Sequence, residues 1–211
     1  MDYKELEKNI KIIDQNIIPS NDVLNLLKTY ITSENRFNHS LRVAKLCYEV
    51  AISNKLDNPI KYYLVGLLHD IGKNIDEEKS LEIMEKYFSE YLSEPSYAYH
   101  AFVGAYIAEN DFHIKDKDFI ESIMWHCTGK SNMSLLSKVL YACDKIEPGR
   151  KFDSSTLIAA MMNNCETGFS AVVSANYEFL KSKFVAKGLD FDKENSKYSK
   201  ELFNQYIIDQ K

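Results

Sequence analysis

A histidine and an aspartate stand next to each other at positions 69 and 70, directly after an apolar run. In the stretch LVGLLHDIGKN, His69 and Asp70 would bring a nitrogen ligand and an oxygen ligand to the end of one buried helix. Burying either side chain is costly unless it is hydrogen-bonded or bound to a metal ion, and both side chain types are common ligands of divalent metals. The pair therefore predicts a metal site, provided that other ligands reach it.

Four more such side chains lie at or near the ends of segments with helical apolar periodicity. Their positions along the chain are His39, His100, His126 and Asp144. Four imidazoles and two carboxylates are too many ligands for one tetrahedral ion, but they suit two octahedral ions that share a bridging carboxylate. The sequence therefore predicts a dinuclear centre whose metal ligands are His39, His69, Asp70, His100, His126 and Asp144.

The segments that must position these ligands are expected to be almost entirely helical. Only 7 Gly and 4 Pro occur in 211 residues, and short polar joints separate the periodic segments without a strong strand pattern. The fold class is therefore predicted to be all-α, a single-domain helical bundle. Helices are expected from Ser20 or Asn21 to 31, over 37–53, from 59 through the His-Asp pair, over 76–87, from about 99, from 116 to about 126, from 134 to Pro148-Gly149, and over roughly 154–166, 168–187 and 193–207.

Residues 1–19 are expected to form an amphipathic helical extension ahead of the main domain, which covers 20–211. Apolar residues recur at helical spacing up to Pro19, which ends the segment. They are Leu6, Ile10, Ile13 and Ile17. Such a helix could pack on its own domain or on a partner.

Composition and charge restrict the class of protein. The 45% apolar and 27% charged residues are ordinary for a soluble globular domain, and the net charge of -5 argues against a general nucleic-acid binder. A small anionic ligand is compatible with that charge. The first residues lack the apolar core of a signal peptide, and no stretch approaches a membrane span, so a cytoplasmic protein without a membrane partner is expected.

The four cysteines form no metal-binding pattern of their own. They are Cys47, Cys127, Cys143 and Cys165, without a CxxC pair, and each is interpreted as a small buried apolar residue. Cys127 and Cys143 stand next to candidate ligands and could line the site.

Five blocks of sequence carry a family resemblance. They are RFNHSLRVA at 36–44, LLHDIGK at 67–73, HAFVGA at 100–105, WHCTGK at 125–130 and ACDKIEPGR at 142–150. Together they resemble the HD-domain metal-dependent phosphohydrolases, whose H…HD…D signature is matched here, and more closely the symmetrical bis(5'-nucleosyl)-tetraphosphatases among them. Ala101 and Cys127 depart from the residues expected after the third and fourth histidines, which affects the expected substrate more than the metals.

The resemblance implies a helical HD fold with two divalent ions that hydrolyses diadenosine tetraphosphate and related dinucleoside polyphosphates into two nucleoside diphosphates. By position, Asp70 would bridge two ions, the first held by His39, His69 and Asp144 and the second by His100 and His126. Iron is the first expectation for the metal, with manganese, cobalt, nickel, zinc and magnesium as alternatives. A small-molecule nucleotide is the expected partner, and a homodimer is compatible with the sequence.

Hydrolysis of a phosphoanhydride at such a centre would need cations as well as metals. Two metal ions would lower the pKa of a bridging water from roughly 15.7 toward neutrality, and charge would build up on the phosphate oxygens. Lys73, one helical turn after Asp70, is the first candidate to contact them. Arg36 and Arg150 follow, since a guanidinium can hold two phosphate oxygens. The predicted catalytic residues are therefore Asp70, Lys73, Arg36 and Arg150.

Other side chains are expected to contribute binding or support. The polar loop after His126 could donate further hydrogen bonds to the substrate from Thr128, Gly129 and Lys130. Glu147 could orient Arg150 or a ligand histidine. Tyr97 and Tyr99 are both candidates for stacking on a base, and the sequence does not choose between them.

Plainer roles and other functions stay open at this stage. Lys73 could instead cap helix carbonyls, and Arg36 could pair with Glu34 or another acid. The same ligands would suit a nucleotidase or phosphodiesterase acting on a nucleoside monophosphate or cyclic nucleotide. A sensor that binds nucleotides without turnover is a third alternative.

Overall fold

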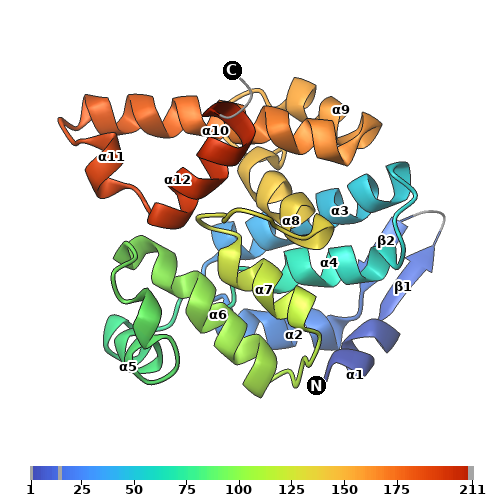
Figure 1. The fold of residues 1–211 in the computed structure, drawn as a ribbon. Helices are drawn as coiled ribbons and strands as arrows, with labels where there is room; N and C mark the ends of the chain where they lie inside the picture. The colour runs from blue at the N-terminus through green and yellow to red at the C-terminus, as the bar shows by residue number, and fades with distance from the viewer. Residues whose placement is uncertain (1, 14–15, 209–211) are drawn as a thin grey trace.

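The computed structural model describes residues 2–13 and 16–208, and helices provide nearly all of its regular structure (Figure 1). Within those residues, strands occur only in one antiparallel hairpin. The elements in chain order are α1 (Tyr3–Lys8), β1 (Ile10–Ile13), β2 (Asn16–Pro19), α2 (Asn21–Tyr30), α3 (Glu34–Ser53), α4 (Pro59–Leu68), α5 (Glu77–Tyr87), η1 (Ser89–Tyr91), η2 (Ser96–Ala98), α6 (Tyr99–Asn110), α7 (Lys117–Trp125), α8 (Leu135–Ile146), α9 (Ser155–Asn163), α10 (Cys165–Ala186), α11 (Phe191–Glu194), α12 (Lys197–Phe203) and the π-helix η3 (Asn204–Ile208).

The centre of the molecule is a bundle in which α3 packs along α4 and both helices contact α8. Helix α7 lies between α6 and α8, while α5 covers the outer side of α6 (Figure 1). The C-terminal helices α9 to α12 lie together over α8, at the top of Figure 1, and the hairpin lies beside α1 at the opposite end. This arrangement confirms the predicted all-α class.

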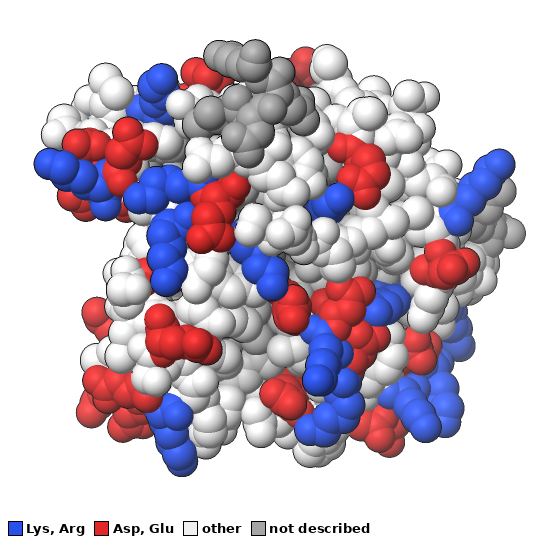
Figure 2. Space-filling view, viewed as in Figure 1, with Lys and Arg blue, Asp and Glu red and all other residues white. Residues whose placement is uncertain are grey.

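The surface and the helices agree with an ordinary globular composition. Figure 2 shows acidic and basic side chains interspersed over the face viewed there. Over 2–13 and 16–208, none of the helices combines the length and the apolar character that a membrane crossing requires.

Side-chain caps fix the starts of α2 and of three helices that lead to site residues, α4, α7 and α8. Ser20, Asn58, Asp116 and Ser134 each accept a hydrogen bond from a backbone N–H in the first turn of α2, α4, α7 and α8, respectively. Pro59 occupies the first position of α4, where its missing N–H costs nothing. Because a cap depends on residues close in sequence, these starts could be predicted, and the structure confirms them.

The amphipathic helix predicted over residues 1–19 is wrong beyond Lys8. Helix α1 ends there, and β1 then pairs with β2 so that Ile10 lies opposite Pro19. Ile10 is buried as the helical pattern required, but Ile13 is 52% exposed. The segment IKII is rich in β-branched side chains, which favour a strand over a helix, and this outweighs the helical spacing.

The boundaries of the C-terminal helices also differ from the expected ones. The helix predicted over 193–207 is interrupted, because α11 ends at Glu194 and Ser196 caps α12 by accepting from two backbone N–H groups. The Ser196 hydroxyl also donates to the buried carboxylate of Glu94. Asn164 caps α10, so the break after α9 falls earlier than expected.

Three cysteines are buried as predicted, and one is only partly buried. Cys47, Cys143 and Cys165 lie in the main core, whereas Cys127 has intermediate exposure. All four are free thiols.

The close packing of α3 on α4 depends on Gly66. A Cβ at this position would lie 2.7 Å from the Ala44 Cα and 2.9 Å from the Ala44 nitrogen, which are rigid backbone atoms. We therefore expect Gly66→Ala to lower the free energy of unfolding by about 1–3 kcal/mol, although alanine is the better helix former. Urea denaturation of both proteins would measure this.

Gly104→Ala provides the matched control, since Gly104 is also helical. Its added Cβ would meet the Ile123 side chain at 3.3 Å, and a methyl group can move aside. We expect Gly104→Ala to unfold near the wild-type midpoint. Equal midpoints for the two variants would contradict the role given to Gly66.

Candidate metal centre

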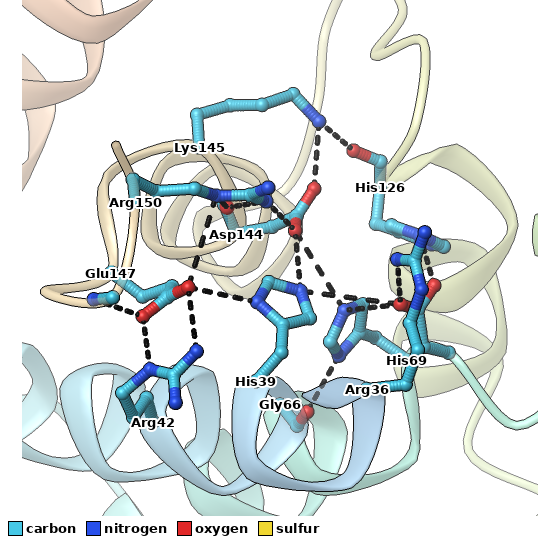
Figure 3. A network of polar contacts seen from close by, with 12 residues as sticks. Arg36, His39, Arg42, Gly66, His69, His126, Asp144, Lys145, Glu147 and Arg150 are labelled. Atoms are coloured by element: carbon cyan, nitrogen blue, oxygen red, sulfur yellow. Dashed lines mark hydrogen bonds and ion pairs between the residues drawn. The ribbon is translucent and has the colours of Figure 1, made fainter. Parts of the chain in front are cut away.

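The structure brings the six predicted ligands together at the ends or on the first half of five different helices. Figure 3 labels four of them, His39, His69, His126 and Asp144. His39 lies on the first half of α3, His100 in the first turn of α6, and Asp144 in the last turn of α8. His69 and His126 are the residues that end α4 and α7. Asp70 follows His69 and is buried, with 2% of its surface exposed.

Gly72 holds the turn that carries His69 and Asp70 against α6. A Cβ on Gly72 would overlap the main-chain carbonyl oxygen of His100 and lie 2.5 Å from the Gly104 nitrogen. Only glycine therefore allows this backbone approach, which places Asp70 next to the first turn of α6.

The two oxygens of Asp70 face two different groups of histidines. Oδ1 lies 3.3 Å from His100 Nε2 and 3.6 Å from His126 Nε2. Oδ2 lies 3.6 Å from His69 Nε2 and 3.9 Å from His39 Nε2. His39, His69 and Asp70 form the first group of candidate ligands, and Asp70, His100 and His126 form the second. Within each group, the candidate ligand atoms lie within 4.8 Å of one another. A carboxylate placed in this way can bridge two cations.

All four imidazoles are oriented through Nδ1. His69, His100 and His126 each make a hydrogen bond from Nδ1 to the main-chain carbonyl three residues earlier, at 2.7, 2.8 and 2.6 Å. His39 Nδ1 lies 3.0 Å from Glu147 Oε1. A carbonyl can only accept, so Nδ1 carries the proton in the first three rings and Nε2 offers a lone pair. Ligand histidines in metal sites are held in the same manner.

One of these Nε2 atoms has no hydrogen-bond partner among the described residues. His69 is fully buried, and its Nε2 atom points into the group formed with His39 and Asp70. A buried polar atom without a partner is costly, and a divalent cation would satisfy it. Asp144 Oδ1 lies 3.1 Å from His39 Nε2 and 3.8 Å from His69 Nε2, so it can complete this group. The donor set therefore fits divalent metal binding.

Both carboxylates are ionised at neutral pH. Burial would raise the pKa of Asp70. Three imidazoles nevertheless hold that pKa well below its usual range, in the order His69, His100 and His126. Burial would likewise raise the pKa of Asp144, and Lys145 leads the groups that lower it well below the usual value.

Three of the imidazoles are neutral at pH 7. Burial lowers the pKa of His69 to about 4 and also lowers the pKa values of His100 and His126. Burial would also lower the pKa of His39, but hydrogen bonds to the carboxylates of Asp144 and Glu147 raise that pKa above its usual value. Neutral imidazoles are the form that binds metals.

We expect the metal-free protein to lose stability as the pH falls from about 6.5 to about 4. Over this range His69 takes up a proton in the unfolded chain but not in the folded one, so protonation favours unfolding. The loss should reach about 3 kcal/mol, because one pKa unit corresponds to roughly 1.4 kcal/mol. Urea titrations of chelator-treated protein at several pH values would measure it.

The control for this effect is His69→Gln, which cannot titrate. Its free energy of unfolding should vary less with pH between about 6.5 and 4 than that of the wild type. A variant with an unchanged slope would show that His69 does not cause the dependence.

Two of the predicted cations contact the ligands from the open side. Arg36 Nη1 lies 3.0 Å from Asp70 Oδ2, and 42% of the Arg36 side chain is exposed. Lys73 Nζ lies 3.4 Å from His100 Nε2, the ring nitrogen that offers a lone pair. Burial lowers the pKa of Lys73. Both charges can therefore reach an anion bound beside the ligands.

The third predicted cation, Arg150, holds Asp144 instead. Its guanidinium lies 2.7 Å from Asp144 Oδ1 and also donates to the Asp144 main-chain carbonyl at 2.9 Å from Nε (Figure 3). Lys145 contributes from the other side, 2.8 Å from Asp144 Oδ2 and 3.0 Å from the His126 carbonyl. These contacts fix the carboxylate in place.

The loop after His126 makes its contacts elsewhere. The carbonyl of Thr128 accepts a hydrogen bond from Ser199 of α12, and Gly129 packs against the same helix. Lys130 forms a 3.0 Å ion pair with Glu121. Their predicted role in substrate binding stays a prediction without a contact that supports it.

Two residues that hold carboxylates of the site in place, Arg42 and Lys145, were not predicted from the sequence. Arg42 holds Glu147 with two hydrogen bonds, of 2.5 and 3.2 Å, while Glu147 orients His39 as expected. Arg42 lies one helical turn after His39, and that spacing was the available signal. Lys145 adjoins Asp144 in sequence, but only the structure shows that its amine also reaches α7.

Several known proteins are similar to this chain. A Mycoplasma genitalium protein described as a probable nicotinate-nucleotide adenylyltransferase/Ap4A hydrolase is 37% identical over 124 residues, which are 57% of this chain but only 34% of that protein. The symmetrical bis(5'-nucleosyl)-tetraphosphatase of Bacillus subtilis is 32% identical over 133 residues, 62% of this chain and 70% of that one.

A solved structure and a family model extend the likeness. The crystal structure of a "predicted HD superfamily hydrolase involved in NAD metabolism" from Clostridium acetobutylicum has a TM-score of 0.74 and 27% identity, covering 90% of this chain and 97% of that one. The HD domain model matches residues 36–149, which include all six candidate ligands. The chain therefore belongs to the HD domain family.

Proposed function

We propose that this protein is a metal-dependent hydrolase that cleaves diadenosine tetraphosphate and related dinucleoside polyphosphates symmetrically into two nucleoside diphosphates. The observation that carries the proposal is Asp70, whose two oxygens face two groups of oriented imidazoles. The name of the Bacillus subtilis relative supports the substrate and the symmetric cleavage.

We propose two divalent ions, one held by His39, His69, Asp70 and Asp144 and the other by Asp70, His100 and His126, with iron as the first candidate. When bound, such ions act as Lewis acids toward phosphate oxygens and lower the pKa of a coordinated water.

The chain's own side chains would orient and neutralise the tetraphosphate. Arg36 and Lys73 lie beside the two groups of ligands, on the side from which their charges can contact phosphate oxygens. Arg150 and Lys145 act on Asp144, and Glu147 acts on His39, so these three are positioning residues. Positive charges held in advance of binding cost little reorganisation as negative charge develops on the leaving phosphate.

Identification of the products tests the function most directly. Protein purified without oxygen and loaded with iron or manganese is incubated with diadenosine tetraphosphate, and nucleotides are separated by anion exchange. The proposal requires ADP as the sole nucleotide product. ATP together with AMP, or an uncleaved substrate, would contradict it. Turnover of a nucleoside monophosphate or a cyclic nucleotide alone would favour a different HD nucleotidase.

Metal removal is expected to abolish hydrolysis and leave the fold intact. The ligands lie on five helices that already share one apolar core, so the chelated protein should retain its helical circular dichroism. Activity should return as divalent ions are added back, with about two ions bound per chain by elemental analysis. Full activity in the chelated protein would contradict the proposed mechanism.

A further inference from the structure

A pocket of about 390 Å³ opens directly beside the candidate metal centre. His100 and Lys73 form the wall that it shares with the second group of ligands. The opposite walls come from the start of α5, with Glu77 and Leu81, and from η2, with Tyr97. Helices α5 and α6 pack side by side and frame this region (Figure 1).

The pocket changes character along its length. At the metal end it has the Lys73 amine, which suits phosphate. Farther away, Leu81 is 42% exposed and Tyr97 49% exposed, so both present apolar surface to an open site. Among the described lining residues, Glu77 is the only carboxylate, and it suits ribose hydroxyls or amino groups rather than phosphate. Binding sites of roughly 300–1,000 Å³ with this mixture are typical of small-molecule ligands.

Tyr97 is better placed than Tyr99 to stack on a flat ring. The Tyr99 hydroxyl donates to the Leu92 carbonyl at 2.8 Å, and its ring packs on the smaller apolar cluster. Tyr97 lines the pocket, and about half of its surface is exposed. Its side chain is therefore accessible to a ligand in the pocket. The Tyr97 carbonyl also accepts from His100, which fixes its backbone beside the ligands.

A second pocket, of about 330 Å³, does not meet these conditions. Its lining includes Glu34, Phe37 and Asn38 of α3. At 3.6 residues per turn these three lie on the face opposite to Arg36 and His39. A nucleotide there could not place its phosphates at the metal centre.

From this geometry we infer that the pocket between α5 and η2 binds one nucleoside of the substrate, with the base stacked on Tyr97 and the phosphates running past Lys73 to the metals. The inference rests on the proposed function for its substrate. It adds the residue that recognises the nucleoside.

The test separates binding of the base from binding of the phosphates. The fluorescent nucleotide etheno-ADP is titrated into metal-loaded protein, and inorganic pyrophosphate is measured by competition. Tyr97→Ala should weaken etheno-ADP binding at least about fivefold, the lower end of what one base stacked on an aromatic ring contributes. The KM for diadenosine tetraphosphate should rise by a similar factor. Tyr97→Phe should behave as the wild type, because it keeps the ring.

Tyr87→Ala is the matched control, since Tyr87 is 48% exposed on α5 but lies outside the pocket. Tyr87→Ala should leave the affinities for etheno-ADP and for pyrophosphate unchanged. Tyr97→Ala should leave the affinity for pyrophosphate unchanged. Equal losses for etheno-ADP and pyrophosphate would overturn the inference, because Tyr97 would then act through His100. Unaltered etheno-ADP binding and KM in Tyr97→Ala would also overturn it, while leaving the proposed function intact. A wild type that binds etheno-ADP through Tyr97 but cleaves no dinucleoside tetraphosphate would refute only the proposed function.

Discussion

Asp70→Ala is expected to remove both metal binding and hydrolysis. The Asp70 carboxylate is the one group shared by the two sets of candidate ligands, so its loss removes a carboxylate ligand from both sets. Removing a single group that stabilises a transition state often costs roughly 10²–10³-fold in rate, and a shared metal ligand should cost at least about a thousandfold. Elemental analysis and kcat/KM for diadenosine tetraphosphate would measure the two effects.

Asp116→Ala is a suitable control, because Asp116 caps α7 and pairs with Lys61 away from the ligands. It should keep the metal content and the catalytic rate of the wild type, at some cost in stability. Circular dichroism would show whether Asp70→Ala still folds. A folded Asp70→Ala protein that retains turnover would refute the bridging role.

Lys145→Met is expected to reduce kcat/KM by about 10–100-fold, as is typical when a residue that orients a metal ligand is lost. Lys145 contacts Asp144 Oδ2 at 2.8 Å and the carbonyl of His126 at 3.0 Å, so it ties a ligand of one group to a ligand of the other. Burial would lower its pKa, but the Asp144 carboxylate raises it, and the amine stays charged. Methionine keeps most of the volume without the charge.

Lys138→Met is the control on the same helix. Its side chain is 15% exposed against 20% for Lys145, and it forms an ion pair of 2.7 Å with Glu166. The two variants should lose similar stability, but only Lys145→Met should bind metal more weakly. Equal activities for the two variants would contradict the proposed role of Lys145.

The parts of the fold that were predictable depend on local chemistry. Ser20, Asp116 and Ser134 cap helices by accepting a hydrogen bond from the backbone N–H three positions ahead, so the sequence contains the whole interaction. The hairpin after Lys8 was missed because Ile10, Ile13 and Ile17 continue a helical spacing from Leu6 and also fit a strand pair. Its pairing depends on contacts between two separate segments, which periodicity does not reveal.

The candidate ligands were predictable for a different reason. A histidine or aspartate on an apolar face conflicts with its surroundings, and this conflict is visible without a structure. The partners of Arg150 and Lys145 were not visible, because an exposed cation and a cation on a buried acid look the same in a sequence. The structure places Arg150 on Asp144, whereas Arg36 and Lys73 lie where a phosphate could reach them.

The distribution of the ligands along the chain has a consequence for biosynthesis. His39 and Asp144 are more than a hundred positions apart, and the helices after α8 contribute none of the six candidate ligands. A nascent chain emerges from its N-terminus, so the complete ligand set does not exist until Asp144 has left the ribosome. Loading of the proposed two-metal centre would therefore come late in synthesis, only after α3, α4, α6, α7 and α8 have assembled.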